Sequence, residues 1–476
     1  MYLLSLNIYL LFSLSRSFIN TWYNEKQNFK YSQRNINQME KKINKIQTTK
    51  QFLKEQYLAD SRPWVVTFSG GKDSSTVLHL TVEVLLELKD EGKDSKTVYI
   101  VSSDTGVEMP VINNYFFKKL DQLRIFIKNN NLNMKVQVVS PEVEQTFWTL
   151  LLGKGYPSPN QNFRWCTDRL KINPATKFLT SISNENRSIL MLLGVRSDES
   201  QTRAESIEKR DRNHRGLVKH DTVPNTFVLS PIKDWTNSEV WDFLMMHKAP
   251  WGNHNDMLSL YHKGSGEADC NIALNPEAPS CGKTRFGCWV CTVVSKDKSM
   301  ANMLQNDEDR WMKPLNDFRN DLEDYRYDHT TRQDRRRNGQ KGIGPFKMHI
   351  RQKLLRKLLT IEKDLLPKLN GKYLISNEEI IQIQKEWLHD GDFFETAISI
   401  ANDFNRDISH SSKKAFSKEE RTFFTSLSAD KGIKIQLMDQ LLQTEHKYRH
   451  QLKRSGILMD IEAVVEAYAL GKLNEI

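Results

Sequence analysis

The fold of this chain is decided by the stretch WVVTFSGGKDS, residues 64–74. Its first part, Trp64–Phe68, is a short apolar run that is typical of a buried parallel strand. From Ser74 to Leu88, apolar residues recur at helical spacing, which predicts an amphipathic helix. Glycines between a strand and a helix let the backbone approach an anion, and the helix N-terminus favours negative charge. A plain turn with a chance lysine is the alternative. We predict a phosphate-binding loop made of Ser69, Gly70, Gly71, Lys72, Asp73 and Ser74.

Strand-like apolar runs recur through the first half of the chain, at residues 64–68, 98–101, 136–139, 189–194 and 227–232. Helical patterns separate several of them, as at 74–88 and 113–128. This alternation predicts an α/β fold with a doubly wound parallel sheet. After about residue 255 the pattern changes, and from Met300 it is mainly helical. We therefore expect four parts: an N-terminal extension (1–38), a nucleotide-binding α/β domain (39–255), a cysteine-bearing loop (256–298) and a basic helical region (299–476).

Composition narrows the class of protein. The chain has 69 Lys and Arg against 59 Asp and Glu, and the net charge of +10 fits a polyanionic partner. Five cysteines in 476 residues argue against a disulfide scaffold. The apolar run in residues 1–20 is shorter than a membrane span and lacks the features of a signal peptide. We expect a cytoplasmic protein with no membrane partner, and we expect translation to start at Met39.

Three polar segments are expected to meet at one edge of the sheet, because ligands bind beyond the carboxyl ends of parallel strands. They are the phosphate loop, the segment that begins at Asp104, and residues 194–203. Asp104 could hold Mg²⁺ or a nucleotide hydroxyl, although a simple strand-end turn is the alternative. Gly194, Arg196 and Arg203 are candidate phosphate contacts, although a solvated charged loop would look the same. Further on, Thr236 or Asn237 could cap a helix.

The cysteines suggest two further sites. Cys166 lies among the cations of the segment 164–171, and nearby cations would lower the pKa of a thiol. A sulfur-carrying or substrate-facing cysteine is one interpretation, and a buried free cysteine is the other. Four more cysteines fall in one loop, where they could converge on zinc or on a [4Fe–4S] cluster. These candidate ligands are Cys270, Cys281, Cys288 and Cys291.

A dense group of cations follows the cysteine loop. Ten Lys and Arg side chains lie between Arg332 and Lys357, with Asp334 as the one acid. Phosphate contacts by such side chains give sequence-independent affinity for nucleic acid. A solvated helix face that buries leucines on its other side would show the same pattern. If this group binds nucleic acid, Arg335, Arg336 and Arg337 are the candidate contacts to its backbone.

The motifs carry a resemblance to a known family. The SGGKDS loop resembles the PP-loop of the N-type ATP pyrophosphatases. Over roughly residues 45–370, the ordered set resembles the DndC family, the sulfurtransferase-type proteins of bacterial DNA phosphorothioation. That set is SGGKDS (69–74), DTGVE (104–108), WCTDRLK (165–171), GVRSDES (194–200), PIKDW (231–235), CGKTRFGCWVC (281–291), RRRNG (335–339) and GPF (344–346).

The resemblance implies the chemistry. ATP would adenylylate an oxygen of the DNA backbone, and sulfur from a cysteine desulfurase would displace AMP. It implies a [4Fe–4S] cluster on the four loop cysteines, catalytic roles for Lys72, Asp73, Cys166 and Lys171, and other subunits of a phosphorothioation complex as partners. The alternatives are a phosphoadenylyl-sulfate reductase or a tRNA thiolase on the same fold, or a non-catalytic iron–sulfur subunit that binds DNA.

Overall fold

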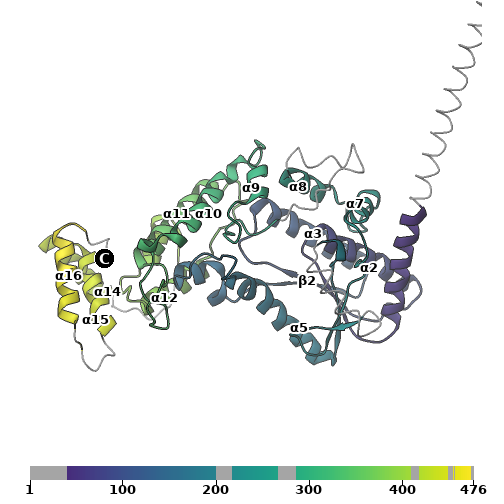
Figure 1. Ribbon diagram of the computed structural model, residues 1–476, viewed down its shortest axis with the longest axis horizontal. Helices are drawn as coiled ribbons and strands as arrows, with labels where there is room; N and C mark the ends of the chain where they lie inside the picture. The colour runs from purple at the N-terminus through teal and green to yellow at the C-terminus, as the bar shows by residue number, and fades with distance from the viewer. Residues whose placement is uncertain are drawn as a thin grey trace, which may run out of the picture.

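The computed structural model describes residues 40–199, 217–265, 286–408, 418–448, 454 and 456–472. A six-stranded sheet with the order β3-β2-β1-β4-β6-β5 forms the centre of the N-terminal half (Figure 1). Five strands are parallel, and β5 pairs antiparallel with β6 at one edge. The strands are β1 (Trp64–Thr67), β2 (Val98–Ser103), β3 (Met134–Val139), β4 (Ile189–Leu192), β5 (Val218–Lys219) and β6 (Thr226–Leu229).

All five strand-like runs of the sequence form strands of this sheet, so the predicted α/β fold is confirmed. The two predicted helices are α2 (Lys72–Asp90) and α3 (Pro110–Asn129). Both begin earlier than the apolar pattern indicates, because a first helical turn needs no apolar residue. Proline is favoured in that turn, which explains the start of α3. The sequence did not reveal β5, because two residues are too short for a pattern.

Helices cover both faces of the sheet, as a doubly wound fold requires. Alternate residues of a strand point to opposite faces. Trp64 and Val66 of β1 accordingly pack with α2, α3, α7 (Asn237–Met246) and α8 (Asn255–Ser265). Val65 packs instead with α5 (Asn173–Asn186) on the other face (Figure 1). The predicted cap at Thr236 is confirmed, since its side chain accepts from the Glu239 amide in a capping box.

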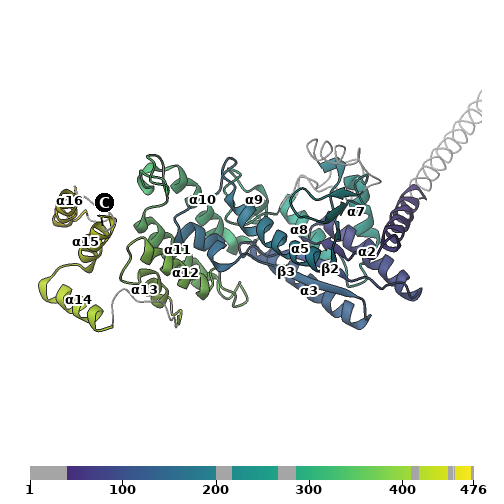
Figure 2. The same cartoon turned by 90° about the horizontal axis from the view of Figure 1, so that it is seen from below.

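The C-terminal half is helical, as predicted. Its helices are α9 (Lys298–Met303), α10 (Lys313–Tyr327), α11 (Met348–Leu365), α12 (Asn377–His389), α13 (Thr396–Asp403), α14 (Lys418–Lys431), α15 (Ile435–Tyr448) and α16 (Ile457–Ala469). Both views show α14–α16 as a separate group at the end of the molecule remote from α2 (Figures 1 and 2). Every helix in the described ranges is too short or too polar to cross a lipid bilayer.

A second hydrophobic core joins α9–α13 to the segment that follows β3. Trp148, Leu151 and Trp165 of that segment are buried with Trp289 from the cysteine-bearing loop and Phe318 from α10. This core contains no residue of the sheet. It therefore places the segment around Cys166 against the helical region, beside the carboxyl end of β3.

Candidate functional site

The phosphate loop lies at the point where the chain connections of the sheet change direction. Strands β1 and β4 are neighbours, and their connections lead to opposite sides of the sheet. Ligands of open α/β sheets bind at such a point. Gly70 has a φ of +74°, which disfavours any residue with a side chain. Gly71 precedes α2, and no side chain caps that helix. The first amides of α2 can therefore meet an anion.

Two tyrosines hold the loop from the α3–α8 side. The Tyr115 hydroxyl donates to the Gly70 carbonyl at 3.3 Å, and the Tyr261 hydroxyl accepts from the Lys72 amide at 3.5 Å. Burial, with a smaller contribution from the Asp73 charge, raises the pKa of Tyr261 to about 12. Burial also raises the pKa of Tyr115. Both phenols therefore stay neutral at pH 7 and keep their hydrogen bonds to the loop.

Asp73 is the centre of a charge network inside the loop. Its Oδ2 lies 2.7 Å from Lys72 Nζ, and its Oδ1 lies 2.6 Å from Arg196 Nε. Arg196 is 2% exposed and also donates to the Trp235 carbonyl and the Asn237 side chain. Arg196 Nη1 also lies 3.3 Å from Asp198 Oδ2, so two cations and two carboxylates form one network behind the loop. In this arrangement Arg196 orients Asp73 from beneath the loop, while Arg203 lies outside the described residues.

Gly194 allows the end of β4 to touch the start of α2. A Cβ at this position would lie 2.8 Å from the Asp73 carbonyl carbon and from the Ser74 nitrogen. Cβ atoms almost never approach backbone atoms so closely, so only glycine fits here. The segment 194–196 therefore packs directly on the phosphate loop, as the sequence predicted for residues of the same sheet edge.

The end of β2 carries a second polar group next to the loop. Asp104 accepts from the Gly106 amide at 2.9 Å, which is the turn that the alternative interpretation expected. Glu108 accepts from the Thr105 hydroxyl at 2.6 Å and from its amide. Burial is the main cause that raises the pKa of Glu108, and the Asp104 charge adds to it. Two carboxyl groups therefore meet beside the nucleotide-binding edge.

The second half of the cysteine-bearing loop docks on this group. Cys288 forms a β-bridge with Glu108, and the Trp289 amide donates to the Val107 carbonyl at 3.0 Å. The Cys291 amide donates to the Cys288 carbonyl at 3.0 Å, which closes a tight turn with two thiols. Burial raises the pKa of Cys288 to about 12. A buried thiol of this kind becomes a thiolate only with a compensating positive charge, such as a metal ion.

Cys270 and Cys281 lie outside the described residues. Within the described ranges, no three His, Cys, Asp or Glu side chains are arranged to hold a metal ion. The four-cysteine site therefore remains a prediction. The turn at Cys288 and Cys291 supplies two sulfur donors of the kind that zinc and iron–sulfur clusters take.

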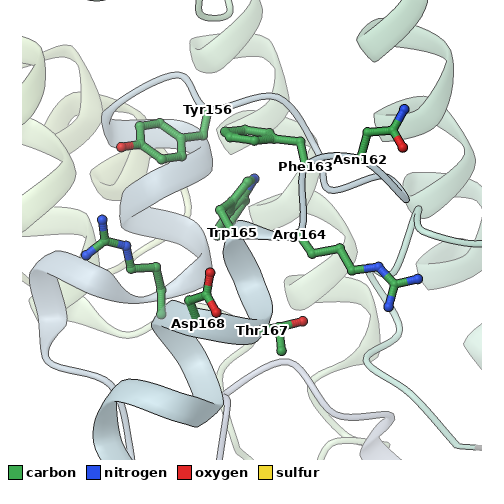
Figure 3. Close-up of a pocket in the computed structure, with 8 residues that line it drawn as sticks. Tyr156, Asn162, Phe163, Arg164, Trp165, Thr167 and Asp168 are labelled. Carbon is green, nitrogen blue, oxygen red and sulfur yellow. The ribbon is translucent and has the colours of Figure 1, made fainter. Parts of the chain in front are cut away.

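Cys166 lies on α4 (Trp165–Thr167) and is half-buried. The expectation that nearby cations lower its pKa is wrong, because burial raises the pKa and the Cys291 charge raises it further. The exposed Arg164 side chain reaches away from the aromatic side chains around it (Figure 3). Lys171 instead acts on the second polar group, where burial raises the pKa of Glu108 and of Cys288 and the Lys171 charge offsets part of that rise. The structure thus brings Cys166, Lys171, Cys288 and Cys291 to one place.

Part of the chain is similar to a known type of domain. Residues 63–294 match the phosphoadenosine phosphosulfate reductase domain. The match begins at the first strand and ends just after Cys291, so it contains the phosphate loop, the β2 edge and the cysteine-bearing loop.

Individual proteins from archaea and bacteria are also similar to parts of this chain. An uncharacterised protein of Methanocaldococcus jannaschii is 30% identical over 219 residues, which cover 46% of this chain and 38% of that protein. Adenosine 5'-phosphosulfate reductase 2 of Bacillus subtilis is 25% identical over 206 residues, 43% of this chain and 73% of the reductase. The chain spans about two fifths of the length of the first archaeal relatives. Among solved structures, the U34-tRNA thiolase NcsA of Methanococcus maripaludis with its [4Fe–4S] cluster gives a TM-score of 0.26 at 13% identity, covering 59% of this chain and 78% of the thiolase.

The cations of residues 332–357, which follow the matched residues 63–294, are of two kinds. Several are bound internally: Arg332 donates to the Gly344 carbonyl, and Arg351, 1% exposed, pairs with Asp390. Arg356 and Lys357 of α11 pair with Asp403 and Asp321. These side chains follow the alternative interpretation, in which the cations belong to a structural helix.

A second kind of cation lies on a hairpin before α11, namely Arg335, Arg336, Arg337 and Lys341. The hairpin is bridged between Arg335 and Lys341, and its side chains from residue 333 to 341 are exposed. Arg335, Arg336, Arg337 and Lys341 form no ion pair with any described residue. The hairpin therefore carries a group of cations that are outside ion pairs with the described residues.

Sequence reasoning missed Tyr115, Tyr261 and Glu108. Tyr261 is 189 residues away from Lys72 in the chain, and no local pattern links a helical tyrosine to a distant loop. Glu108 belongs to the DTGVE motif, and both of its neighbours in the chain, Val107 and Met109, are apolar and buried. Their apolar character indicated that Glu108 would also be partly buried. The motif therefore held the signal for Glu108, whereas nothing in the sequence indicated the tyrosines.

Proposed function

We propose that this protein is an ATP pyrophosphatase that transfers sulfur to the DNA backbone, as in DNA phosphorothioation. The observation that supports it best is the juxtaposition of two groups on neighbouring strands. The phosphate loop follows β1, and the group of Glu108, Cys288 and Lys171 lies at the end of β2. A nucleotide held by the first group would present its α-phosphate toward the second.

The chemistry needs activation, because an oxygen of a phosphodiester is a poor leaving group. A non-bridging oxygen of the DNA attacks the α-phosphorus of ATP, and pyrophosphate leaves. A sulfur nucleophile then attacks the activated DNA phosphorus, and AMP leaves with the oxygen. In this scheme the α2 amides bind the phosphates and Lys72 contacts the departing pyrophosphate. Arg196 keeps Asp73 oriented, and Lys171 contacts the AMP phosphate or the DNA.

The chain carries residues of the types that the implied cofactors bind. Cys288 and Cys291, with Cys270 and Cys281, would hold a [4Fe–4S] cluster, which supplies redox or sulfur-binding chemistry beside the nucleotide. Asp104 would bind Mg²⁺ through water, since its carboxylate lies at the nucleotide-binding edge. A cysteine desulfurase is the class of enzyme that would provide the sulfur as a persulfide, and a two-electron reductant would cleave the S–S bond to leave that sulfur on the DNA phosphorus. DNA and the other subunits of a phosphorothioation complex complete the proposed partners.

A second candidate is reduction of adenosine 5'-phosphosulfate. The Bacillus subtilis relative and one of Salinibacter ruber, 25% identical over 32% of this chain and 50% of the relative, carry that name. Sulfur transfer to tRNA is a third candidate on the same type of domain. Each predicts a different product from the same loop: sulfite, thiolated tRNA or phosphorothioated DNA.

ATP–pyrophosphate exchange tests the loop, and mass spectrometry of digested DNA tests the product. Lys72→Ala and Asp73→Ala should each remove most of the exchange, because the first loses a cation at the transferred phosphates and the second loses the carboxylate that pairs with Lys72 and Arg196. The matched control is Lys93→Ala, an exposed lysine just beyond the other end of α2 that pairs with Glu91. Normal exchange in both loop variants would disprove the loop assignment. If the product is sulfite or thiolated tRNA and not phosphorothioate dinucleotides, DNA is not the substrate.

A further inference from the structure

A groove lies between the basic hairpin and the segment that leads to Cys166. It encloses about 620 Å³, within the range of pockets that hold small molecules. Four arginines line it: Arg326, Arg332, Arg336 and Arg337. Aromatic rings also line it, and two of them are open to solvent, Phe163 at 43% and Tyr327 at 63% exposure. Its lining includes no carboxylate.

The walls of the groove are fixed by backbone contacts. The Phe346 amide donates to the Gly155 carbonyl at 2.7 Å, and Arg337 Nη1 donates to the Lys154 carbonyl at 2.6 Å. Gly155 has a φ of +69°, and a Cβ there would lie 3.0 Å from the Phe346 carbonyl oxygen. Such contacts hold the hairpin in place against the segment before Cys166. The groove is therefore a built feature of the fold.

The groove continues toward Cys166. A second cavity of about 600 Å³ shares Tyr156 and Phe163 with it and is also lined by Trp165 and Thr167, the two neighbours of Cys166. Figure 3 shows the rings of Tyr156, Phe163 and Trp165 gathered at this place. The ring centroids of Tyr156 and Phe163 lie 6.4 Å apart, and those of Tyr156 and Trp165 lie 5.7 Å apart. An aromatic path thus connects the arginine groove with the cysteine.

The arginines of the groove favour an anionic partner, and its exposed aromatic rings favour a partner with flat apolar groups. The Nη1 atom of Arg326 is buried and has no hydrogen-bond partner within the described ranges. Arginine forks bind phosphates, and bases stack on exposed aromatic rings. A base pair inside a duplex shows only its edges, because its faces are covered by its neighbours. Exposed rings within a cationic groove therefore favour bases that are out of the duplex.

We propose that this groove binds an unpaired segment of DNA, with bases stacked on Phe163 and Tyr327 and phosphates held by Arg336 and its neighbours. The choice of DNA rests on the proposed function, whereas the preference for unpaired nucleotides rests on the groove alone. The aromatic path would then carry the strand toward the cavity beside Cys166. A duplex substrate would have to open locally before its backbone reaches the site.

Binding of labelled oligonucleotides by the full chain tests this inference. Fluorescence anisotropy compares a short single strand with the duplex of the same sequence, without ATP or a sulfur donor. Phe163→Ala and Tyr327→Ala should each weaken single-strand binding by roughly tenfold, which is typical of one lost stacking contact. Duplex affinity should change by less than about twofold. The matched control is Phe423→Ala, an aromatic side chain of α14 that is 61% exposed and far from the groove.

Two further measurements keep the result interpretable. Phe163→Trp keeps a stacking ring, so it should restore single-strand affinity, while a simple loss of packing would not be rescued in this way. Thermal unfolding checks that each variant is folded. Wild-type single-strand affinity in both alanine variants would overturn the inference. An RNA strand bound tenfold more tightly than DNA would overturn the choice of DNA. Absence of pyrophosphate exchange in the wild-type protein, with intact single-strand binding, would refute only the proposed function.

Discussion

Gly194→Ala is the sharpest test of how the sheet edge builds the phosphate loop. The new Cβ would lie 2.8 Å from backbone atoms of Asp73 and Ser74, whereas ordinary contacts begin at 3.4 Å. The start of α2 must therefore move by about 0.6 Å, the difference of these distances. The strand cannot retreat, because the Leu193 amide is bonded to the Leu229 carbonyl at 2.9 Å. Overpacking of this kind costs about 1–3 kcal/mol.

That cost corresponds to a fall in melting temperature of roughly 2–12 °C for a domain of this size. The helix amides that would bind phosphate move with the backbone, and a shift of about 1 Å can cost about a hundredfold in rate. We expect pyrophosphate exchange to fall by roughly tenfold or more. Gly287→Ala is the matched control for stability, since a Cβ there meets no atom within 4 Å. A Gly194→Ala protein with wild-type melting temperature and exchange rate would refute the reasoning.

Three further predictions follow from other parts of the chain. Cys288→Ser should abolish iron binding in protein purified without oxygen and lower its thermal stability, since metal binding contributes to folding; unchanged iron content would exclude this cysteine as a ligand. Changing Arg335 and Arg336 to Ala should reduce the salt dependence of duplex binding by about 0.9 per lost phosphate contact, whereas Arg356→Ala, which removes an already paired cation, should not. Burial, with help from a nearby carboxylate, raises the pKa of Asp439 to about 7, so the folded protein keeps a proton that the unfolded chain loses near pH 4. The stability from this proton is complete below about pH 4 and lost as the pH rises to about 7, so Asp439→Asn should flatten the stability profile between pH 5 and 8 in urea titrations; equal slopes would exclude the effect.

Local patterns in the sequence were sufficient for the sheet and its first helices. A buried parallel strand needs a short apolar run, and α2 needs apolar residues at helical spacing, so both features are written in neighbouring residues. The cap at Thr236 was predictable for the same reason, because a capping box spans only four residues. The position of the phosphate loop followed from the rule that ligands meet the carboxyl ends of strands.

Long-range pairing could not be predicted in this way. Arg196 looked like a free phosphate contact, but Asp73 lies 123 residues earlier in the chain and binds it. Cys166 is surrounded by cations in sequence, yet its surroundings in space are apolar residues and another cysteine, which reverse the expected direction of its pKa. The cations of residues 332–357 were equally ambiguous, because the carboxylates that neutralise part of them come from other helices.

The shared core of the helical region has a consequence for how such a protein changes over evolutionary time. The segment after β3 and helices α9–α13 bury the same tryptophans, so neither can be gained or lost without the other. A chain that ended before α9 would leave Trp148 and Trp289 facing water and would be prone to aggregate. The sheet has its own separate cores and is free of this dependence. Selection could therefore replace the helical half only together with the segment after β3, which carries Cys166 and Lys171, while the sheet and the phosphate loop are inherited unchanged.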